Sequence, residues 1–261
     1  MASYKSKALV LRSYRFKETD KILKLFSLES GIIDCIAKGV CSAKSKLCGR
    51  LELFNFIDCE ISSGKNLDII TQAEIIESFE DISNDFIKFA YSQVISEIIL
   101  KTHSGKTPEI NLFKLAYITL RALNNEEKSN IHSQKKILFF FILKFLKITG
   151  YFPLLNSCSV CGSQIFTDSK KDESNEYFFS VKAGGFACSQ CRNSAGSLYI
   201  INEKIFSILN IFPRLKIEEF VEIDISAENL NKLIDIFMNY LCYHADVSID
   251  SFNYMKKIKE V

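Results

Sequence analysis

Two C-x-x-C pairs in the middle of the chain are its clearest candidates for chemistry. Cys158 and Cys161 form the first pair, Cys188 and Cys191 form the second, and 26 residues separate the two pairs. Four thiolates in a tetrahedral array select zinc or, less often, an iron–sulfur cluster. A redox-active dithiol is a further interpretation, but it is typical of a thioredoxin-like βαβ context that this sequence lacks. We therefore predict that these four cysteines bind Zn2+.

The same residues predict a structural ion and not a catalytic one. A catalytic zinc usually has three protein ligands and keeps one position open for water, whereas four cysteines would close the site. Binding of the ion would then stabilise a segment at about residues 156–195, which has few core residues of its own. Within this zinc module, residues 176–188 follow a polar stretch at 168–176 and can form a hairpin that brings the two pairs together.

The rest of the sequence offers little for catalysis. It contains no G-x-x-x-x-G-K-[ST] loop for a nucleotide, no G-x-S-x-G nucleophile elbow and no H-E-x-x-H zinc motif. The three histidines, His103, His132 and His244, have no suggestive neighbours in the sequence. We therefore expect a binding protein and not an enzyme.

The net charge of +2 hides a polarised distribution of charge along the chain. Residues 1–50 hold eleven Lys or Arg and four Asp or Glu, residues 51–100 hold two and ten, and residues 101–150 hold nine and three. This layout indicates a basic surface that suits an anionic partner. The paired cysteines favour the reducing cytoplasm, and the apolar run at 137–143 is far too short to span a membrane, so we expect a cytoplasmic protein without a membrane partner.

Two hydrophobic periods divide the chain. Residues 1–80 alternate with the period of β-strands in five short stretches, at 7–16, 20–29, 31–40, 51–62 and 67–79, with a polar, basic loop at 38–50. Five short strands predict an OB-fold barrel, with an SH3-like barrel as the second choice. From residue 81 the apolar residues recur at helical spacing, which predicts an α-helical domain over 81–261 that contains the zinc module. The predicted fold class is α+β.

Basic and aromatic residues interleave in the barrel segment. OB-folds hold single strands with cations for the phosphates and aromatic faces for the bases, and such binding tolerates many sequences and weakens with salt. A solvated charged face with Phe16 in the core is the other interpretation of the same pattern. The residues that we predict to bind nucleic acid are Lys7, Arg12, Arg15, Lys17, Lys38, Lys44, Lys46 and Arg50.

Several ordered motifs resemble those of the RecO family of bacterial recombination mediators. They are ALVLRSYRFKETDKILKLFSLESG at 8–31, AKGVCSAKSKLCGRLELF at 37–54, TQAEIIESF at 71–79, GYFPLLNSCSVCG at 150–162 and FSVKAGGFACSQC at 179–191. The resemblance implies an N-terminal OB-fold, a helical C-terminal domain with a zinc module, and binding to single- and double-stranded DNA. It also implies ATP-independent annealing of single strands and a nucleoid-associated location.

The resemblance further implies protein partners. With RecR, members of the family load RecA onto strands coated by single-strand-binding protein, whose C-terminal tail is acidic and apolar. For that tail we predict Lys135 and Lys136, beside the apolar face of 137–148. The basic loop departs from the family, which is often richer in arginine there. Lys44 and Lys46 keep the charge but lose the bidentate fork, so we expect weaker DNA affinity with the role preserved.

Two other classes of function stay open on the sequence alone. A zinc-containing enzyme acting on nucleic acid would need an open metal site or an acidic cluster on the barrel. A zinc-stabilised interaction scaffold would make no direct contact with nucleic acid.

Overall fold

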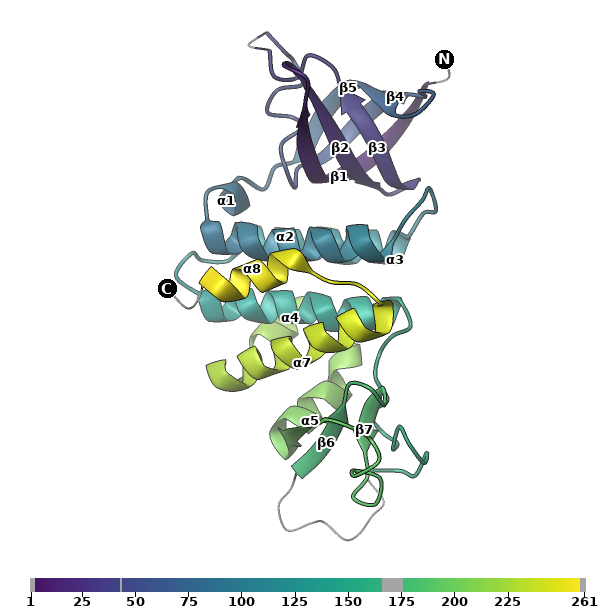
Figure 1. Ribbon diagram of the computed structural model, residues 1–261. Coiled ribbons are helices and arrows are strands. Elements are labelled where there is room, and N and C mark those ends of the chain that lie inside the picture. Colours follow the sequence, from purple (N-terminus) through teal and green to yellow (C-terminus); the bar gives the residue numbers. More distant parts are fainter. Residues whose placement is uncertain (1–2, 43, 166–175, 259–261) are drawn as a thin grey trace. The chain divides into compact units, whose positions relative to one another are not determined.

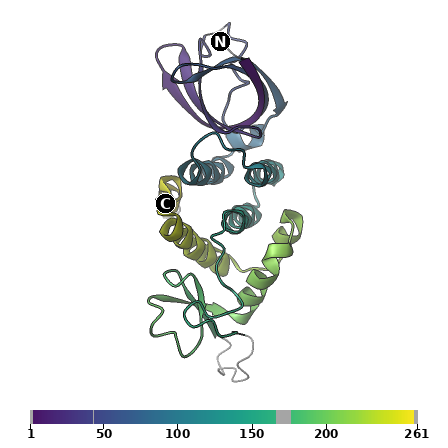
Figure 2. The same ribbon diagram turned by 90° about the vertical axis from the view of Figure 1, so that its right-hand side faces the viewer.

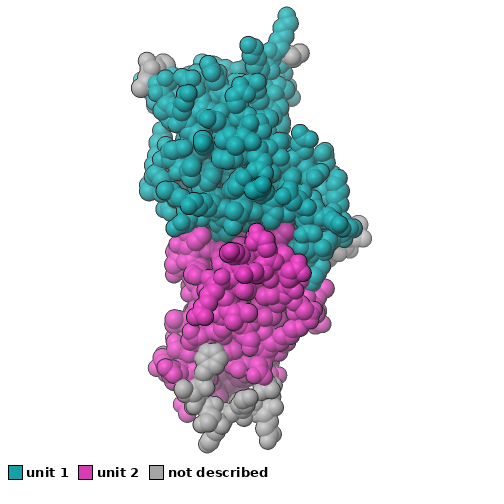
Figure 3. All heavy atoms as spheres, turned by 180° about the vertical axis from the view of Figure 1, so that it is seen from behind, with its two compact units in different colours: residues 1–134, 249–261 teal, residues 135–248 magenta. Residues whose placement is uncertain are grey.

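The computed structural model describes residues 3–42, 44–165 and 176–258 (Figure 1). The polar stretch predicted at 168–176 therefore lies outside the described residues except for Glu176. The chain divides into two compact units (Figure 3). Unit 1 comprises Met1–Gln134 and Ile249–Val261, and unit 2 comprises Lys135–Ser248.

Unit 1 begins with a closed five-stranded barrel, which Figure 2 shows closing around its axis. Its strands are β1 (Ser3–Phe16), β2 (Asp20–Ser27), β3 (Gly31–Ala37), β4 (Phe56–Ser62) and β5 (Asp68–Glu77). They follow one another around the barrel in the order β1-β2-β3-β5-β4, and β3 pairs with β5 in parallel while the other pairs are antiparallel. The predicted five-stranded OB-fold barrel is confirmed.

The alternation along the strands fills the barrel with small and branched apolar side chains. Leu23, Leu25, Ile33 and Ile57 belong to one fully buried cluster. Polar residues between them point outward because successive side chains of a strand face opposite sides of the sheet. The pairing of β1 with β2 shifts by one residue between Val10 and Arg12, so that Arg12 comes opposite Lys24.

The β2–β3 turn requires glycine where it meets the loop after helix α2 (Phe86–Thr102). Gly31 has a φ of +67°, and a Cβ at this position would lie 2.3 Å from the carbonyl oxygen of Thr107. The neighbouring Ile32 N–H donates to the carbonyl oxygen of Gly105 at 3.1 Å. The barrel and this loop therefore contact each other backbone to backbone.

Helices complete unit 1 on one side of the barrel (Figure 1). They are α1 (Glu80–Ser83), α2, α3 (Ile110–Asn125), the first residues of α4 (Ile131–Ile148) and the C-terminal α8 (Asp250–Ile258). Asp85 caps α2 by accepting from the N–H groups of Ile87 and Lys88. Phe26 of β2 packs on Phe113 of α3, with ring centroids 5.4 Å apart, so the barrel and α3 share an aromatic contact.

Unit 2 combines helices with a small sheet. Its elements are the remainder of α4, the strands β6 (Glu176–Ser180), β7 (Gly185–Ala187) and β8 (Leu198–Asn202), the helices α5 (Glu203–Ile211), α6 (Ile217–Val221) and α7 (Ala227–Ala245), and a short 3-10 turn at Phe212–Arg214. The strand order is β7-β6-β8, which contains the expected hairpin and adds β8. Buried phenylalanines such as Phe139, Phe179 and Phe237 form its core. Among the described residues, no helix is both long and apolar enough to cross a bilayer.

Candidate nucleic-acid interface and metal centre

An apolar row crosses the outer face of β1, β2 and β3. Tyr14 lies opposite Ile22, and Ile22 lies opposite Ile36, and cross-strand partners share one face of a sheet. The adjacent Leu23 belongs to the barrel core, so these three residues face outward. Tyr14 is 42% exposed, and Ile22 and Ile36 are half-buried. Within this apolar row, the Tyr14 ring offers an aromatic face on which a base can stack.

A charged row runs beside the apolar row. It consists of Arg12, Lys24 and Asp34, which are direct cross-strand partners in that order. Lys24 and Asp34 form an ion pair at 2.6 Å, and the Arg12 guanidinium lies 5.3 Å from the centre of the Tyr14 ring. Arg12 and Lys24 are like charges directly opposite each other, an arrangement that costs stability unless an anion lies nearby. Asp34 compensates Lys24 in this row, so Arg12 is the member whose positive charge is available to an anionic partner.

The predicted basic loop lies against the β1–β2 hairpin. The Gly39 N–H donates to the Asp20 carboxylate at 2.8 Å, and the Cys41 N–H donates to the Thr19 carbonyl oxygen at 2.9 Å. These bonds place the start of the loop, with the exposed Lys38, beside the hairpin that carries Arg15 and Lys17. Lys44 and Lys46 are exposed farther along the loop.

The hairpin also exposes its aromatic residue. Phe16 is 38% exposed, and the Lys17 ammonium lies 5.5 Å from the centre of its ring. This position excludes the alternative in which Phe16 belongs to the core. The hairpin thus presents both a ring and cations to solvent.

Two of the predicted DNA contacts lie away from this face. Lys7 is exposed opposite Asp58 of β4. Arg50 donates to the carbonyl oxygen of Ala73 at 3.0 Å and pairs with Glu74 at 3.0 Å. The structure therefore gathers Arg12, Arg15, Lys17 and Lys38 near the β1–β2–β3 face but not Lys7 and Arg50.

The four cysteines of the zinc module come together in unit 2. Their sulfur atoms all lie within 4.8 Å of one another, and the Cys161 and Cys188 sulfurs are 3.8 Å apart. A tetrahedron with Zn–S bonds of about 2.3 Å has sulfur–sulfur edges of roughly 3.8 Å. The N–H groups of Val160 and Cys188 point at the Cys158 sulfur, each at 3.4 Å. The four residues therefore fit a tetrahedral metal ion.

Backbone contacts of β7 bring the two pairs to this distance. A Cβ at Gly185 would lie 2.4 Å from the carbonyl oxygen of Leu154, so only glycine allows the segment before Cys158 to approach β7. The Ser159 N–H then donates to the carbonyl oxygen of Phe186 at 2.8 Å. These contacts explain why a glycine stands at position 185, shortly before the second cysteine pair.

The electrostatics of the cluster favour a bound cation. The side chain and N–H of Ser163, followed by the neighbouring thiols, lower the pKa of Cys161 to about 6. Side-chain hydrogen bonds, most strongly the one with Cys161 and next the one with Cys188, raise the pKa of Cys191 to about 12. A bound cation would stabilise the thiolate form of Cys191 beside that of Cys161.

Comparisons with known proteins place the whole of this arrangement within two adjoining family models. The family model described as recombination protein O N terminal matches residues 1–79, and the one described as recombination protein O C terminal matches residues 83–251. The chain belongs to the RecO family.

The similar relatives carry the name DNA repair protein RecO. The one from Caldanaerobacter subterraneus subsp. tengcongensis is 29% identical over 260 residues, which cover 100% of both chains. The one from Rubrobacter xylanophilus is 34% identical over 195 residues, covering 75% of this chain and 74% of the relative. The one from Clostridium novyi is 28% identical over 260 residues, covering 98% and 96%.

The two lysines predicted for a partner's acidic tail make bonds within unit 2. Lys136 is 7% exposed, and its ammonium donates to the carbonyl oxygen of Val221 at 2.8 Å. Burial lowers the pKa of Lys136. Lys135 is half-buried and donates to the side-chain oxygen of Asn231 at 2.9 Å. Lys135 is therefore the more accessible of the two.

The sequence patterns indicated Tyr14 as part of the candidate surface but not its neighbours Ile22 and Ile36 in the apolar row. The alternation of β2 already places Ile22 and Lys24 on one face, which was the available signal. Their pairing with Tyr14 and Arg12 depends on the register across the β1–β2 hairpin. A one-residue change of register would have sent the same side chains to the core.

Proposed function

We propose that this RecO-family chain binds DNA through the β1–β2–β3 face of its barrel and acts as a mediator in recombinational DNA repair. The observation that carries the proposal is the apolar row beside the charged row, next to the cationic hairpin. Bases of a single strand would stack on Tyr14, Ile22 and Ile36, while phosphates would meet Arg12, Arg15 and Lys17. Oligonucleotides bind OB-folds on the corresponding strands.

The finer roles follow from membership of the family. We propose binding to single- and double-stranded DNA, annealing of single strands without ATP and, with RecR, loading of RecA onto DNA coated by single-strand-binding protein. The lack of a nucleotide-binding motif in the sequence supports the independence from ATP. Residues 1–80 would form the DNA-binding domain and 81–261 the helical domain of a cytoplasmic, nucleoid-associated protein without catalytic activity. Lys38, Lys44 and Lys46 would extend the phosphate contacts along the loop, with Lys7 and Arg50 at the margin.

The metal in this proposal is a structural zinc ion. When bound, Zn2+ would cross-link the two cysteine knuckles and withdraw their thiolates from other chemistry. Cys158, Cys161, Cys188 and Cys191 would hold it, and the N–H groups directed at Cys158 would stabilise the thiolate form.

For the acidic tail of single-strand-binding protein we propose Lys135 as the main cationic contact. Lys136 would contribute only by giving up its bond to the carbonyl oxygen of Val221. Charge attraction would bring the tail to α4. The apolar residues of the tail would then need partly exposed apolar side chains near Lys135 to contact.

The proposal is tested by the salt dependence of DNA binding. Anisotropy of a labelled single-stranded oligonucleotide measures the affinity of the wild type and of a variant with Arg12→Glu, Arg15→Glu and Lys17→Glu. Loss of three phosphate contacts should flatten the slope of log affinity against log salt by about 2. The control reverses Lys182 and Arg214, which are exposed in unit 2, and should behave as the wild type.

Two results would contradict the proposal. Absence of binding at low salt would favour the scaffold without nucleic-acid contact, and cleavage of DNA in the presence of magnesium would favour an enzyme. Annealing of complementary strands coated by single-strand-binding protein, with and without this chain, tests the finer role directly.

A further inference from the structure

A cavity of about 310 Å³ lies in unit 1 where β1, α2 and α8 meet. Leu11 and Arg12 line it from β1, Gln93 and Ser96 from α2, and Tyr254 from α8. Arg12 also belongs to the charged row, so the cavity borders the face that we propose for DNA. Its size is at the lower end of the roughly 300–1,000 Å³ typical of sites for small organic groups.

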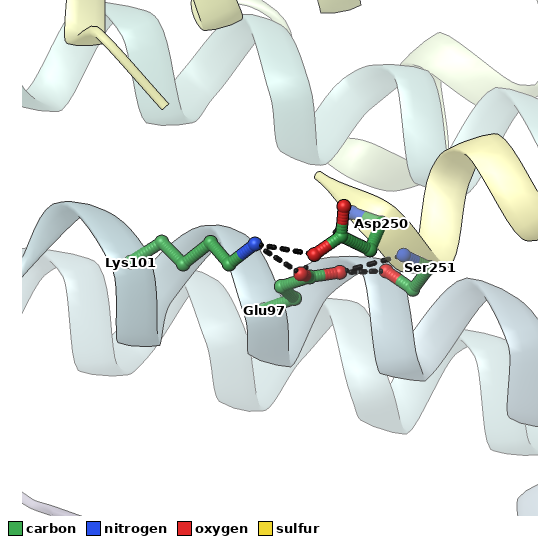
Figure 4. A network of polar contacts seen from close by, with 4 residues as sticks. All are labelled: Glu97, Lys101, Asp250 and Ser251. Atoms are coloured by element: carbon green, nitrogen blue, oxygen red, sulfur yellow. Dashed lines mark hydrogen bonds and ion pairs between the residues drawn. The ribbon is translucent and has the colours of Figure 1, made fainter. Parts of the chain in front are cut away.

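The two carboxylates at the cavity are already compensated. Lys101 pairs with Glu97 and with Asp250, each at 2.8 Å (Figure 4). Glu97 also accepts from the N–H groups of Asp250 and Ser251 and from the Ser251 hydroxyl. The cavity is therefore polar with nearly balanced charge, which suits an uncharged polar group better than a phosphate.

The cavity offers what a nucleobase needs. The Ser96 hydroxyl is buried, with the residue 2% exposed, and has no hydrogen-bond partner among the described residues. The Gln93 amide carries both a donor and an acceptor, and Leu11 supplies apolar surface. Tyr254 is 67% exposed, so its ring is available for stacking. Unstacked bases are held by such aromatic faces and edge contacts.

The Glu97 network fixes the aromatic residue in this position. Glu97 holds the first turn of α8 at Asp250 and Ser251, as Figure 4 shows. Tyr254 follows Asp250 by four residues and so lies on the same side of the helix, one turn on. Glu97 is thus a positioning residue for Tyr254.

A second cavity lies at the same charged row. It measures about 270 Å³ and is lined by Lys24 and Asp34 of that row. Leu100 of α2 lines both cavities. Arg12 therefore lines one cavity, Lys24 and Asp34 line the other, and both cavities reach the same residue of α2.

From these observations we propose that the cavity at β1, α2 and α8 receives an unstacked base of the bound single strand, with Tyr254 stacking on it. The C-terminal helix is then part of the DNA-binding surface, while the phosphates lie on the neighbouring hairpin. This inference rests on the proposed DNA binding and adds to it a subsite outside the barrel.

The test compares Tyr254→Ala, Tyr254→Phe and the control Tyr243→Ala in the full chain. Tyr243 is 56% exposed on α7, so both alanine variants remove an exposed ring. Anisotropy measures their affinity for oligothymidylate of about 16 nucleotides, the upper site size of one OB-fold. Loss of one base–aromatic stack should weaken binding about tenfold for Tyr254→Ala, with Tyr254→Phe and Tyr243→Ala within about twofold of the wild type.

Photocross-linking provides a readout that does not depend on affinity. An oligonucleotide carrying 5-iodouracil should cross-link to the peptide that contains Tyr254. Wild-type affinity of Tyr254→Ala together with cross-links confined to the barrel would overturn the base subsite while leaving DNA binding by the barrel intact. Absence of oligonucleotide binding by the wild type would overturn both proposals.

Discussion

Replacing Glu97 by glutamine should weaken the packing of the C-terminal helix α8 against α2. Burial raises the pKa of Glu97, but the bonds from Lys101, Ser251 and Asp250 outweigh it and lower the pKa from 4.5 to about 2. At about 1.36 kcal/mol per unit, this difference corresponds to about 3 kcal/mol. Because Lys101 and Asp250 are partly exposed to screening solvent, we expect about 2 kcal/mol of lost stability for Glu97→Gln.

Hydrogen–deuterium exchange of residues 249–258 measures this loss where it occurs. At neutral pH these amides should exchange about 30-fold faster in Glu97→Gln than in the wild type, since 1.36 kcal/mol is a factor of ten. Glu218→Gln, an exposed change on α6, serves as the control and should have no effect on α8.

The stability that Glu97 contributes should depend on pH. The folded-state pKa of Glu97 is lowered, so its contribution is complete above the unfolded value of 4.5 and is lost as the pH falls toward about 2. The difference between wild type and Glu97→Gln, compared at equal pH, should shrink over that window. Equal exchange rates at neutral pH, or the same difference at pH values near 2 and 7, would refute the reasoning.

Two further predictions concern the metal centre and the β2–β3 turn. Cys158→Ser or Cys188→Ser should lower the midpoint of thermal unfolding and release zinc, which a colorimetric chelator measures. Loss of DNA annealing with unchanged stability and unchanged zinc content would contradict a structural ion. Gly31→Ala should destabilise unit 1 by about 2 kcal/mol or more, measured by urea unfolding. Residue 31 has a left-handed backbone conformation, and the new Cβ would clash with the Thr107 carbonyl oxygen. Wild-type stability of the variant would show that the loop after α2 moves freely.

The sequence by itself determined the barrel strands and the cluster of four cysteines. Alternation of apolar residues is a local property, so β1 to β3 could be predicted from their own residues. The C-x-x-C spacing likewise restricts each cysteine pair to a tight turn, and the cluster at Cys158 and Cys188 follows once the turns meet. Both features depend on residues that are close together in the sequence.

Only the tertiary structure decided which side chains share a surface. The shift in pairing after Val10 placed Arg12 opposite Lys24, and the fold of unit 2 buried the predicted contact Lys136 under Val221. Tyr254 lies at the cavity beside β1 because Glu97, more than 150 residues earlier, holds the first turn of its helix. Strand register and helix docking depend on contacts between residues far apart in the chain, for which a local sequence pattern carries no signal.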